Sequence, residues 1–170
     1  MKVLVAYISW TGNTRKVAEA IFSQIQVENE IKTISEVDDL KVYDLVFVGF
    51  PIHAFGQVPA EAQRFLEEYC AGKKIVLFVT HGAPEYSLLV PEWLAKCKLI
   101  AQNSKLLGIF NCTGQVAKEQ IDAMLQSSDP KAQEIAKKVA VSSKGQPDTM
   151  RLEQAKAFAR EMIGKAGAVK

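Results

Sequence analysis

A hydroxyl-rich hexapeptide near the amino terminus, Ser9-Trp10-Thr11-Gly12-Asn13-Thr14, carries the residue types best suited to chemistry in this sequence. It follows an apolar strand-like run, residues 2–8, and precedes a helical pattern. Glycine lets the backbone turn tightly, three side chains offer hydroxyls, and the first N–H groups of a helix have no partner within the helix. Together with the positive end of the helix dipole, these groups can hold a dianionic phosphate without a lysine.

Two familiar phosphate loops do not fit the letters of this hexapeptide. A Walker loop needs two glycines and a Gly-Lys-Ser/Thr ending, and a dinucleotide fingerprint needs three glycines spaced G-x-G-x-x-G. Gly12 stands alone here. A short mononucleotide loop remains, beside the simpler interpretation of a polar turn that caps a helix.

Two later segments also follow apolar runs and carry more polar and aromatic residues than a connection needs. We call residues 9–14 the first loop, residues 50–58 the second loop and residues 80–90 the third loop. The only two histidines of the chain, His53 and His81, lie in the second and third loops. Two histidines without a nearby cysteine or a suitably spaced carboxylate are too few for a metal site, so we predict none.

Strand-like and helical patterns alternate over residues 1–112, which predicts an α/β fold with a doubly wound parallel sheet and helices on both faces. The predicted strands are residues 2–8, 30–34, 44–49, 74–80 and 105–112; the predicted helices run to about 26, from 59 to about 71 and from 91 to about 101. From residue 114 the pattern is helical, at about 116–126, 130–141 and 148–163. We expect one domain, residues 1–170, in which the last helix packs against the first strand and about 113–147 is an extra helical segment.

The three loops together resemble the cofactor site of flavodoxins. S-x-T-G-N-T after the first strand resembles their FMN-phosphate loop, and Gly49-Phe50-Pro51-Ile52-His53-Ala54-Phe55-Gly56 resembles their G-x-P-x-aromatic-G loop. Thr80-His81-Gly82-Ala83-Pro84-Glu85-Tyr86 resembles their second flavin wall. The resemblance covers residues 1 to about 112 and the last helix. It implies the five-stranded flavodoxin-like sheet, order 2-1-3-4-5, with ligands bound at the carboxyl ends of strands one and three.

The same resemblance implies FMN as cofactor, with its phosphate in the first loop and its ring between the second and third. The residues expected to bind it are Ser9, Trp10, Thr11, Gly12, Asn13 and Thr14; Pro51, Ile52, His53, Ala54, Phe55 and Gly56; and Thr80, His81, Gly82, Ala83 and Tyr86. His53 or Phe55 is expected to cover one ring face, unless that face stays open, and Tyr86 to stack on the ring. Trp10 packs on the ribityl chain or on a neighbouring helix, and Gly56 allows a backbone carbonyl to turn toward the flavin.

Composition sets the broad class of protein. With 170 residues, 48% hydrophobic and 24% charged, the chain is typical of a soluble globular domain. No apolar run approaches the roughly 20 residues of a membrane span, and no signal peptide is apparent. Three cysteines without a CxxC pair indicate neither disulfides nor a zinc or iron-sulfur site, so we expect free thiols in the cytoplasm.

Charge is distributed unevenly along the chain. Residues 1–130 hold 12 Lys/Arg and 15 Asp/Glu, whereas residues 131–170 hold 9 and 4. Phe158 is the single aromatic residue of this basic tail, which argues against nucleic-acid binding. We interpret the tail first as solvated helix faces and second as a docking surface for an acidic partner.

These observations favour an FMN-binding electron-transfer protein that passes electrons between a reductase and a terminal redox enzyme. We expect a monomer or small homo-oligomer that binds neither nucleic acid nor membrane. Two alternatives stay open: an FMN-dependent NAD(P)H or quinone reductase, favoured by an open flavin face and the extra helices, and a flavin-free binding module.

Overall fold

The computed structural model describes residues 1–53, 56–84 and 86–168. Within them, five parallel strands form one sheet in the order β2-β1-β3-β4-β5, which confirms the predicted fold class. The strands are β1 (Lys2–Tyr7), β2 (Glu28–Thr33), β3 (Leu45–Pro51), β4 (Lys74–His81) and β5 (Lys105–Thr113). The helices are α1 (Asn13–Phe22), the short 3-10 helix η1 (Ile34–Glu36), α2 (Ala60–Glu68), α3 (Leu89–Ile100), α4 (Lys118–Leu125), α5 (Pro130–Ser142) and α6 (Thr149–Ala168).

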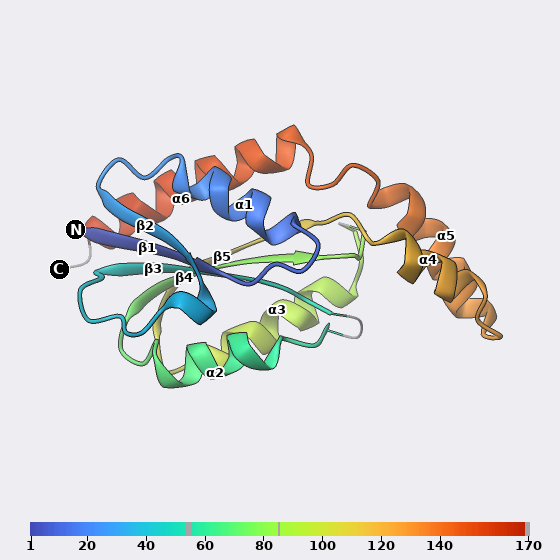
Figure 1. Ribbon diagram of the computed structural model, residues 1–170, viewed down its shortest axis with the longest axis horizontal. Coiled ribbons are helices and arrows are strands. Elements are labelled where there is room, and N and C mark those ends of the chain that lie inside the picture. Colours follow the sequence, from blue (N-terminus) through green and yellow to red (C-terminus); the bar gives the residue numbers. More distant parts are fainter. Residues whose placement is uncertain (54–55, 85, 169–170) are drawn as a thin grey trace.

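Helices cover both faces of the sheet: α1 and α6 lie on one side, and α2 and α3 on the other (Figure 1). Successive strand side chains point to opposite faces, so Leu4 and Val46 pack toward α2 while Val3 and Leu45 pack toward α1 and α6. Because both faces are covered, the central strands are apolar without interruption. This double burial explains why β3 and β4 are recognisable in the sequence.

One glycine is required in the middle of the sheet. A Cβ at Gly49 would lie 2.0 Å from the ring of Phe78, the neighbouring residue on β4. Real contacts are never this close, so the fully buried phenylalanine occupies the space that a larger residue at position 49 would need.

Several helix boundaries differ from the prediction. Helix α1 ends at Phe22 rather than near residue 26. The Ser23 hydroxyl donates to the carbonyl of Ala20, and the next amides, those of Gln24 and Ile25, donate only three residues back, so the α-helical hydrogen bonding stops. Pro59 is the N-cap of α2 rather than its first residue. Helix α6 runs five residues past 163, because Ala166 continues its buried face.

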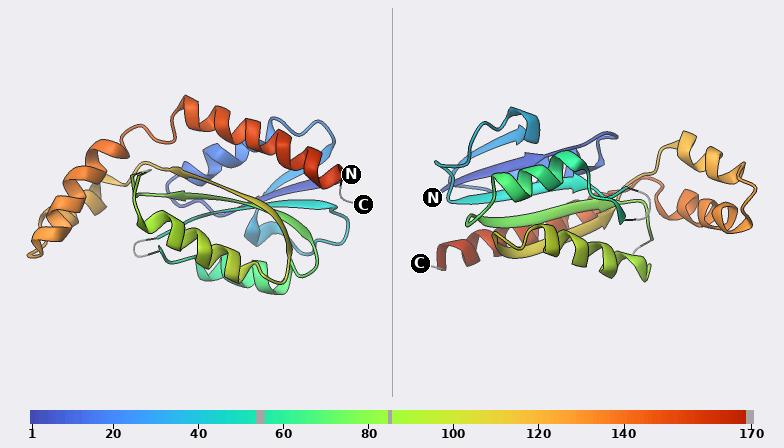
Figure 2. Two further views of the ribbon diagram at one scale, coloured as in Figure 1. Left: turned by 180° about the vertical axis from the view of Figure 1, so that it is seen from behind. Right: turned by 90° about the horizontal axis from the view of Figure 1, so that it is seen from below.

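Helices α4 and α5 form a hairpin that projects beyond the carboxyl ends of the strands (Figures 1 and 2). They pack on each other, and only α5 buries residues, Ala136 and Val139. The base of the hairpin is held by a bond from the Gln115 amide to the Gln146 carbonyl, 2.9 Å. None of the described helices is long and apolar enough to cross a membrane.

Candidate functional site

The carboxyl ends of β1, β3 and β4 bring the three loops to one edge of the sheet. Strand pairing continues one residue past β1 and β3, where the Ile8 amide donates to the Gly49 carbonyl at 2.8 Å and the Ile52 amide to the Thr80 carbonyl at 2.7 Å. The first, second and third loops therefore leave the sheet as neighbours. This is the edge at which open parallel sheets bind ligands.

The first loop presents hydrogen-bond donors around Gly12. This glycine is the N-cap of α1 with φ +86°, and it has no side chain to cap the helix. The hydroxyl of Ser9 accepts a bond from the Arg15 amide (3.2 Å), and that of Thr11 accepts one from Asn13 Nδ2 (3.0 Å). Since both oxygens accept here, both O–H groups can still donate to an anion.

Thr14 is used differently from the other two hydroxyls. It is 1% exposed, and its hydroxyl lies 2.9 Å from that of Thr80, which is 2% exposed. One of the two donates to the other. This buried pair fixes the start of α1 to the end of β4, and thus the first loop to the third.

Asn13 ties the first loop to a segment that the sequence analysis left outside the site. Its Nδ2 donates to the carbonyl of Gln115 at 2.9 Å as well as to Thr11. A Cβ at Gly114 would lie 2.8 Å from the Asn13 side chain, so the glycine permits this close approach. The chain after β5 therefore forms part of the wall around the first loop.

The second loop is a closed turn in contact with the first. The His53 amide donates to the Gln57 carbonyl at 2.9 Å, and the Gly56 amide to the His53 carbonyl at 3.1 Å. The rings of His53 and Trp10 lie 4.2 Å apart at 31°. Trp10 thus packs on the second loop and remains 52% exposed.

The other residues expected in the second loop differ in how far the structure describes them. Pro51, half-buried, ends β3, and Ile52 is buried beneath the turn. Ala54 and Phe55 lie outside the described residues, so the expectation that Phe55 covers the flavin stays a prediction.

Trp93, on α3, contacts both the second and the third loop, and the sequence analysis missed it. Gly56 has φ +75°, and a Cβ there would lie 2.2 Å from the Trp93 ring. The same indole meets His81 edge-on, with ring centroids 6.0 Å apart. If the Gly56 peptide turns, it must do so while in contact with the Trp93 ring. Its only indication in the sequence was its position near the start of a helix, because the start of α3 lies at the same edge of the sheet as the carboxyl ends of the strands.

The third loop is fixed by buried polar groups. His81 is 4% exposed, with Nδ1 3.1 Å from the Ala83 carbonyl and Nε2 3.1 Å from Asn111 Oδ1. The hydroxyl of Thr113 donates to the same Ala83 carbonyl at 2.9 Å. His81 therefore braces the loop rather than lying on its surface. Tyr86, beyond this anchored part, is 80% exposed.

Thiol and metal chemistry have little support here. Burial raises the pKa of Cys97 to about 11 and that of Cys70 to about 12, so both stay protonated thiols at neutral pH. All three cysteines are buried and free. Across the described ranges, no group of three or more His, Cys, Asp or Glu side chains could hold a metal ion.

The arrangement suits a ligand with a phosphate at one end and a flat ring at the other. The first amides of α1, which follow a glycine N-cap, and the hydroxyls of Ser9 and Thr11 suit a phosphate monoester. Trp10 and Tyr86 offer exposed aromatic rings on the adjoining loops. These features fit FMN.

Comparison with known proteins agrees with this fit. Residues 4–160 match the Flavodoxin domain family. The chain is 34% identical, over 99% of its length and 100% of the relative, to the flavodoxin-like domain-containing protein BilS of Clostridioides difficile (strain CD3). The chain therefore belongs to the flavodoxin family, a class of proteins with FMN as cofactor, as the resemblance of its loops implied.

Solved structures show the same fold. Flavodoxin 2 from Bacillus cereus superposes with a TM-score of 0.60 at 19% identity, covering 97% of this chain and 99% of that one. A flavodoxin from the domain Archaea gives 0.59 at 17% identity, covering 98% and 99%. A mutant of the Fusobacterium nucleatum flavodoxin, solved with flavin mononucleotide bound, gives 0.58 at 12% identity, covering 96% and 95%.

Proposed function

We propose that this protein binds FMN between its three loops and carries electrons from a reductase to a terminal redox enzyme. FMN supplies a ring that accepts and releases one or two electrons. The start of α1, with Ser9 and Thr11, holds the phosphate, while the second and third loops hold the ring. Thr14 and Asn13 act indirectly, because their side chains keep the loops together.

The observation that carries the proposed role is an exposed apolar rim beside these loops. Leu88 is 89% exposed, Tyr86 80%, and Trp10 and Leu89 52% each. Large exposed apolar side chains gathered next to a site mark a surface for a protein partner. A carrier must bring its cofactor close to that of its partner, and these four side chains belong to the first and third loops, two of the three loops proposed to hold the cofactor.

The proposal includes a cytoplasmic location and a monomeric or small homo-oligomeric state for this protein. Three free, buried cysteines are compatible with a reducing compartment. The unevenly basic carboxyl-terminal region offers a charged surface to an acidic partner.

The test is a visible absorption spectrum of the purified protein during stepwise dithionite reduction. Bound FMN in a one-to-one ratio that takes electrons singly is the expected result for a carrier. Failure of the apoprotein to bind FMN at micromolar concentration would overturn the proposal and favour the flavin-free binding module.

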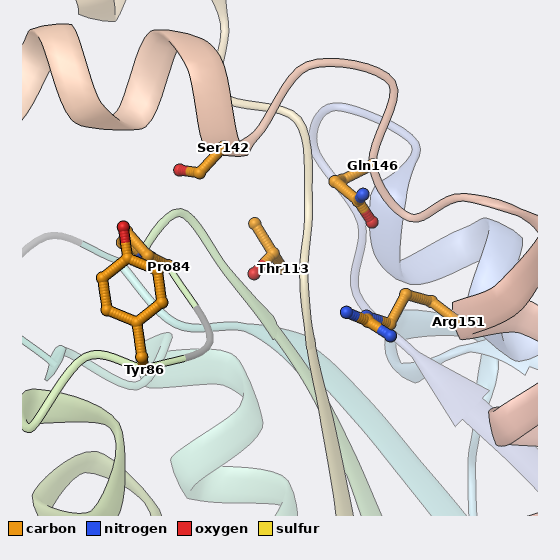
Figure 3. Close-up of a pocket in the computed structure, with 6 residues that line it drawn as sticks. All are labelled: Pro84, Tyr86, Thr113, Ser142, Gln146 and Arg151. Carbon is orange, nitrogen blue, oxygen red and sulfur yellow. The ribbon is translucent and has the colours of Figure 1, made fainter.

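A second candidate is a flavodoxin-fold reductase that transfers hydride from NAD(P)H to a quinone or another small molecule. It is favoured by a cavity of about 180 Å³ beside the third loop (Figure 3), lined by Pro84, Tyr86, Thr113, Ser142, Gln146 and Arg151. Steady-state oxidation of NADPH by a quinone, together with uptake of electrons only in pairs, would select this enzyme over the carrier.

A further inference from the structure

Helix α5 exposes one side along most of its length. The helix packs on α4 and buries Ala136 and Val139. Other residues of α5 follow one another at spacings of three or four, which places them on a common side of the helix. The exposed residues on this side, which we call the outer face of α5, are Lys131, Glu134, Ile135, Lys137, Lys138 and Val141.

The outer face of α5 carries a net positive charge. It contains three lysines and one glutamate, and this Glu134 is paired with Lys138 at 2.7 Å. The side chains of Lys131 and Lys137 form no ion pair or hydrogen bond with any residue that the structure describes. Their charges therefore face the solvent and are open to a binding partner.

The cations of α6 differ in this respect, although they belong to the same basic tail. Each of them donates a hydrogen bond within the fold: Arg151 to Gln154, Lys156 to Glu153, Arg160 to Gln24 and Lys165 to the carbonyl of Leu107. The positive charge of the tail that remains open to a partner is thus concentrated on α5.

The outer face of α5 lies next to the exposed part of the third loop. Ser142, the last residue of α5, lines the same cavity as Tyr86 (Figure 3). The Lys138 ammonium lies within electrostatic range of the Tyr86 phenol. Val141, at this end of the helix, is 80% exposed, and Leu88, beyond Tyr86 in the third loop, is 89% exposed. Lysines and large apolar side chains therefore share one continuous surface.

We propose that the outer face of α5 and the exposed apolar residues of the third loop form the docking surface for an acidic region of a protein redox partner. The inference rests on the proposed function, because it names the surface that the partner of an electron carrier contacts. Apolar side chains supply the water-free centre of an interface, and the lysines attract and orient a partner of opposite charge. A partner bound there lies beside the third loop, one of the loops proposed to hold the flavin ring.

The composition of the hairpin favours a protein over other acidic partners. Residues 115–146 contain no aromatic side chain that could stack on the bases of a nucleic acid. The outer face has only Ile135 and Val141 as apolar residues, whereas a helix that lies in a membrane interface has a broad apolar side.

The test uses cytochrome c and succinylated cytochrome c as probe proteins. Both have the same haem, but succinylation converts lysine ammonium groups to carboxylates, so the probes differ in charge. The FMN-loaded protein is first reduced with dithionite and freed of the excess. Each electron that leaves the flavin then reduces one ferric haem, and haem absorbance gives the rate. The succinylated probe should be reduced faster at low than at high ionic strength, because salt screens the attraction, and the native probe should not.

Two triple variants separate the outer face from net charge. The first is Lys131→Glu with Lys137→Glu and Lys138→Glu, which should slow reduction of the succinylated probe about tenfold or more at low ionic strength. The control is Lys41→Glu with Lys98→Glu and Lys105→Glu, three exposed lysines near the amino ends of β3 and β5. It changes the net charge equally and should slow the reaction less than about threefold. If the first variant fails to fold, glutamine at the same six positions gives the same comparison with a smaller difference.

Several results would overturn the proposal. These are equal slowing in the two triple variants, a rate that does not depend on ionic strength, or faster reduction of native than of succinylated cytochrome c. Binding to vesicles of phosphatidylcholine with phosphatidylserine that is lost in the outer-face variant alone would assign this face to a membrane instead. Leu88→Ser should weaken binding of the succinylated probe without changing its salt dependence, and unchanged binding would remove the third loop from the docking surface.

Failure of the proposed function can be observed separately. Calorimetric titration of the apoprotein with succinylated cytochrome c needs neither flavin nor electron transfer. A chain that binds no FMN would contradict the proposed function, whereas weaker binding of the probe by the outer-face variant than by the control variant would still support the docking surface. Equal binding by the two variants would refute the docking surface whether or not FMN binds.

Discussion

Replacing the two threonines that join α1 to β4 tests how the first and third loops are held together. Thr14 and Thr80 are 1% and 2% exposed, and their hydroxyl oxygens lie 2.9 Å apart. We consider Thr14→Val, Thr80→Val and the double variant. Valine has nearly the same shape as threonine but cannot form the hydrogen bond, so the change removes the bond with little change in packing.

The magnitude follows from the burial of both groups. Each single variant leaves one hydroxyl buried without its partner, which costs about 1–3 kcal/mol. The double variant removes both hydroxyls, and replacing both partners by apolar groups of the same shape can be nearly neutral. The double variant should therefore lose less stability than the two single variants together, with a coupling of about 2 kcal/mol or more.

The assay is urea unfolding of the three apoprotein variants and the wild type, analysed as a double-mutant cycle. Thermal unfolding of the same proteins gives a second measure, because each kcal/mol lost should lower the melting temperature by about 2–4 °C in a chain of this size. Losses that add within about 0.3 kcal/mol would refute the reasoning, because independent sites add in this way. FMN affinity gives a separate readout: a greater loss in Thr14→Val than in Thr80→Val would mean that the Thr14 hydroxyl contacts the phosphate directly.

Three further predictions concern the scaffold around the site. Gly49→Ala should destabilise the apoprotein by about 1–3 kcal/mol or more in urea unfolding, because its Cβ would overlap the Phe78 ring, whereas Gly164→Ala, which meets nothing within 4 Å, should not destabilise it. Ion pairs and a tyrosine hydrogen bond lower the pKa of Glu30 to about 2. The stabilising contribution of Glu30 is therefore present above about pH 4.5 and is lost as the pH falls toward 2. Glu30→Gln should remove this loss from acid-unfolding curves. Asp148→Ala should lower the melting temperature by removing the N-cap of α6, whereas Asp148→Asn should keep most of the wild-type melting temperature; equal losses would contradict a capping role.

The architecture was predictable because the sheet is buried on both sides. Apolar runs such as residues 45–50 and 75–79 are produced by helices covering both faces, and they alternate with helical periodicity in the order of a doubly wound fold. Helix ends were less accurate, since local hydrogen bonding decides them. The Ser23 hydroxyl bond and the tighter bonds of the next two amides end α1 where periodicity alone would continue it to Ile25.

The site was predictable as three loops but not as a network. Residues consecutive in sequence reveal a glycine turn or a cluster of hydroxyls, so the first loop could be identified from its letters. Trp93 contacts Gly56, Asn13 contacts Gln115, and Thr113 and Arg151 line the same cavity. Each pair joins segments that are separated by tens of residues. A single sequence contains no periodicity or spacing rule that brings such pairs together. They follow from the register of the sheet and the base of the hairpin.

The packing of the two indoles has a practical consequence. Trp10 lies against His53, Trp93 lies against Gly56 and His81, and the chain has no other tryptophan. Intrinsic fluorescence excited at the indole band therefore originates entirely beside the three loops. A yellow chromophore held there would quench that emission by resonance energy transfer, so the native chain reports occupancy of its own site without an added label.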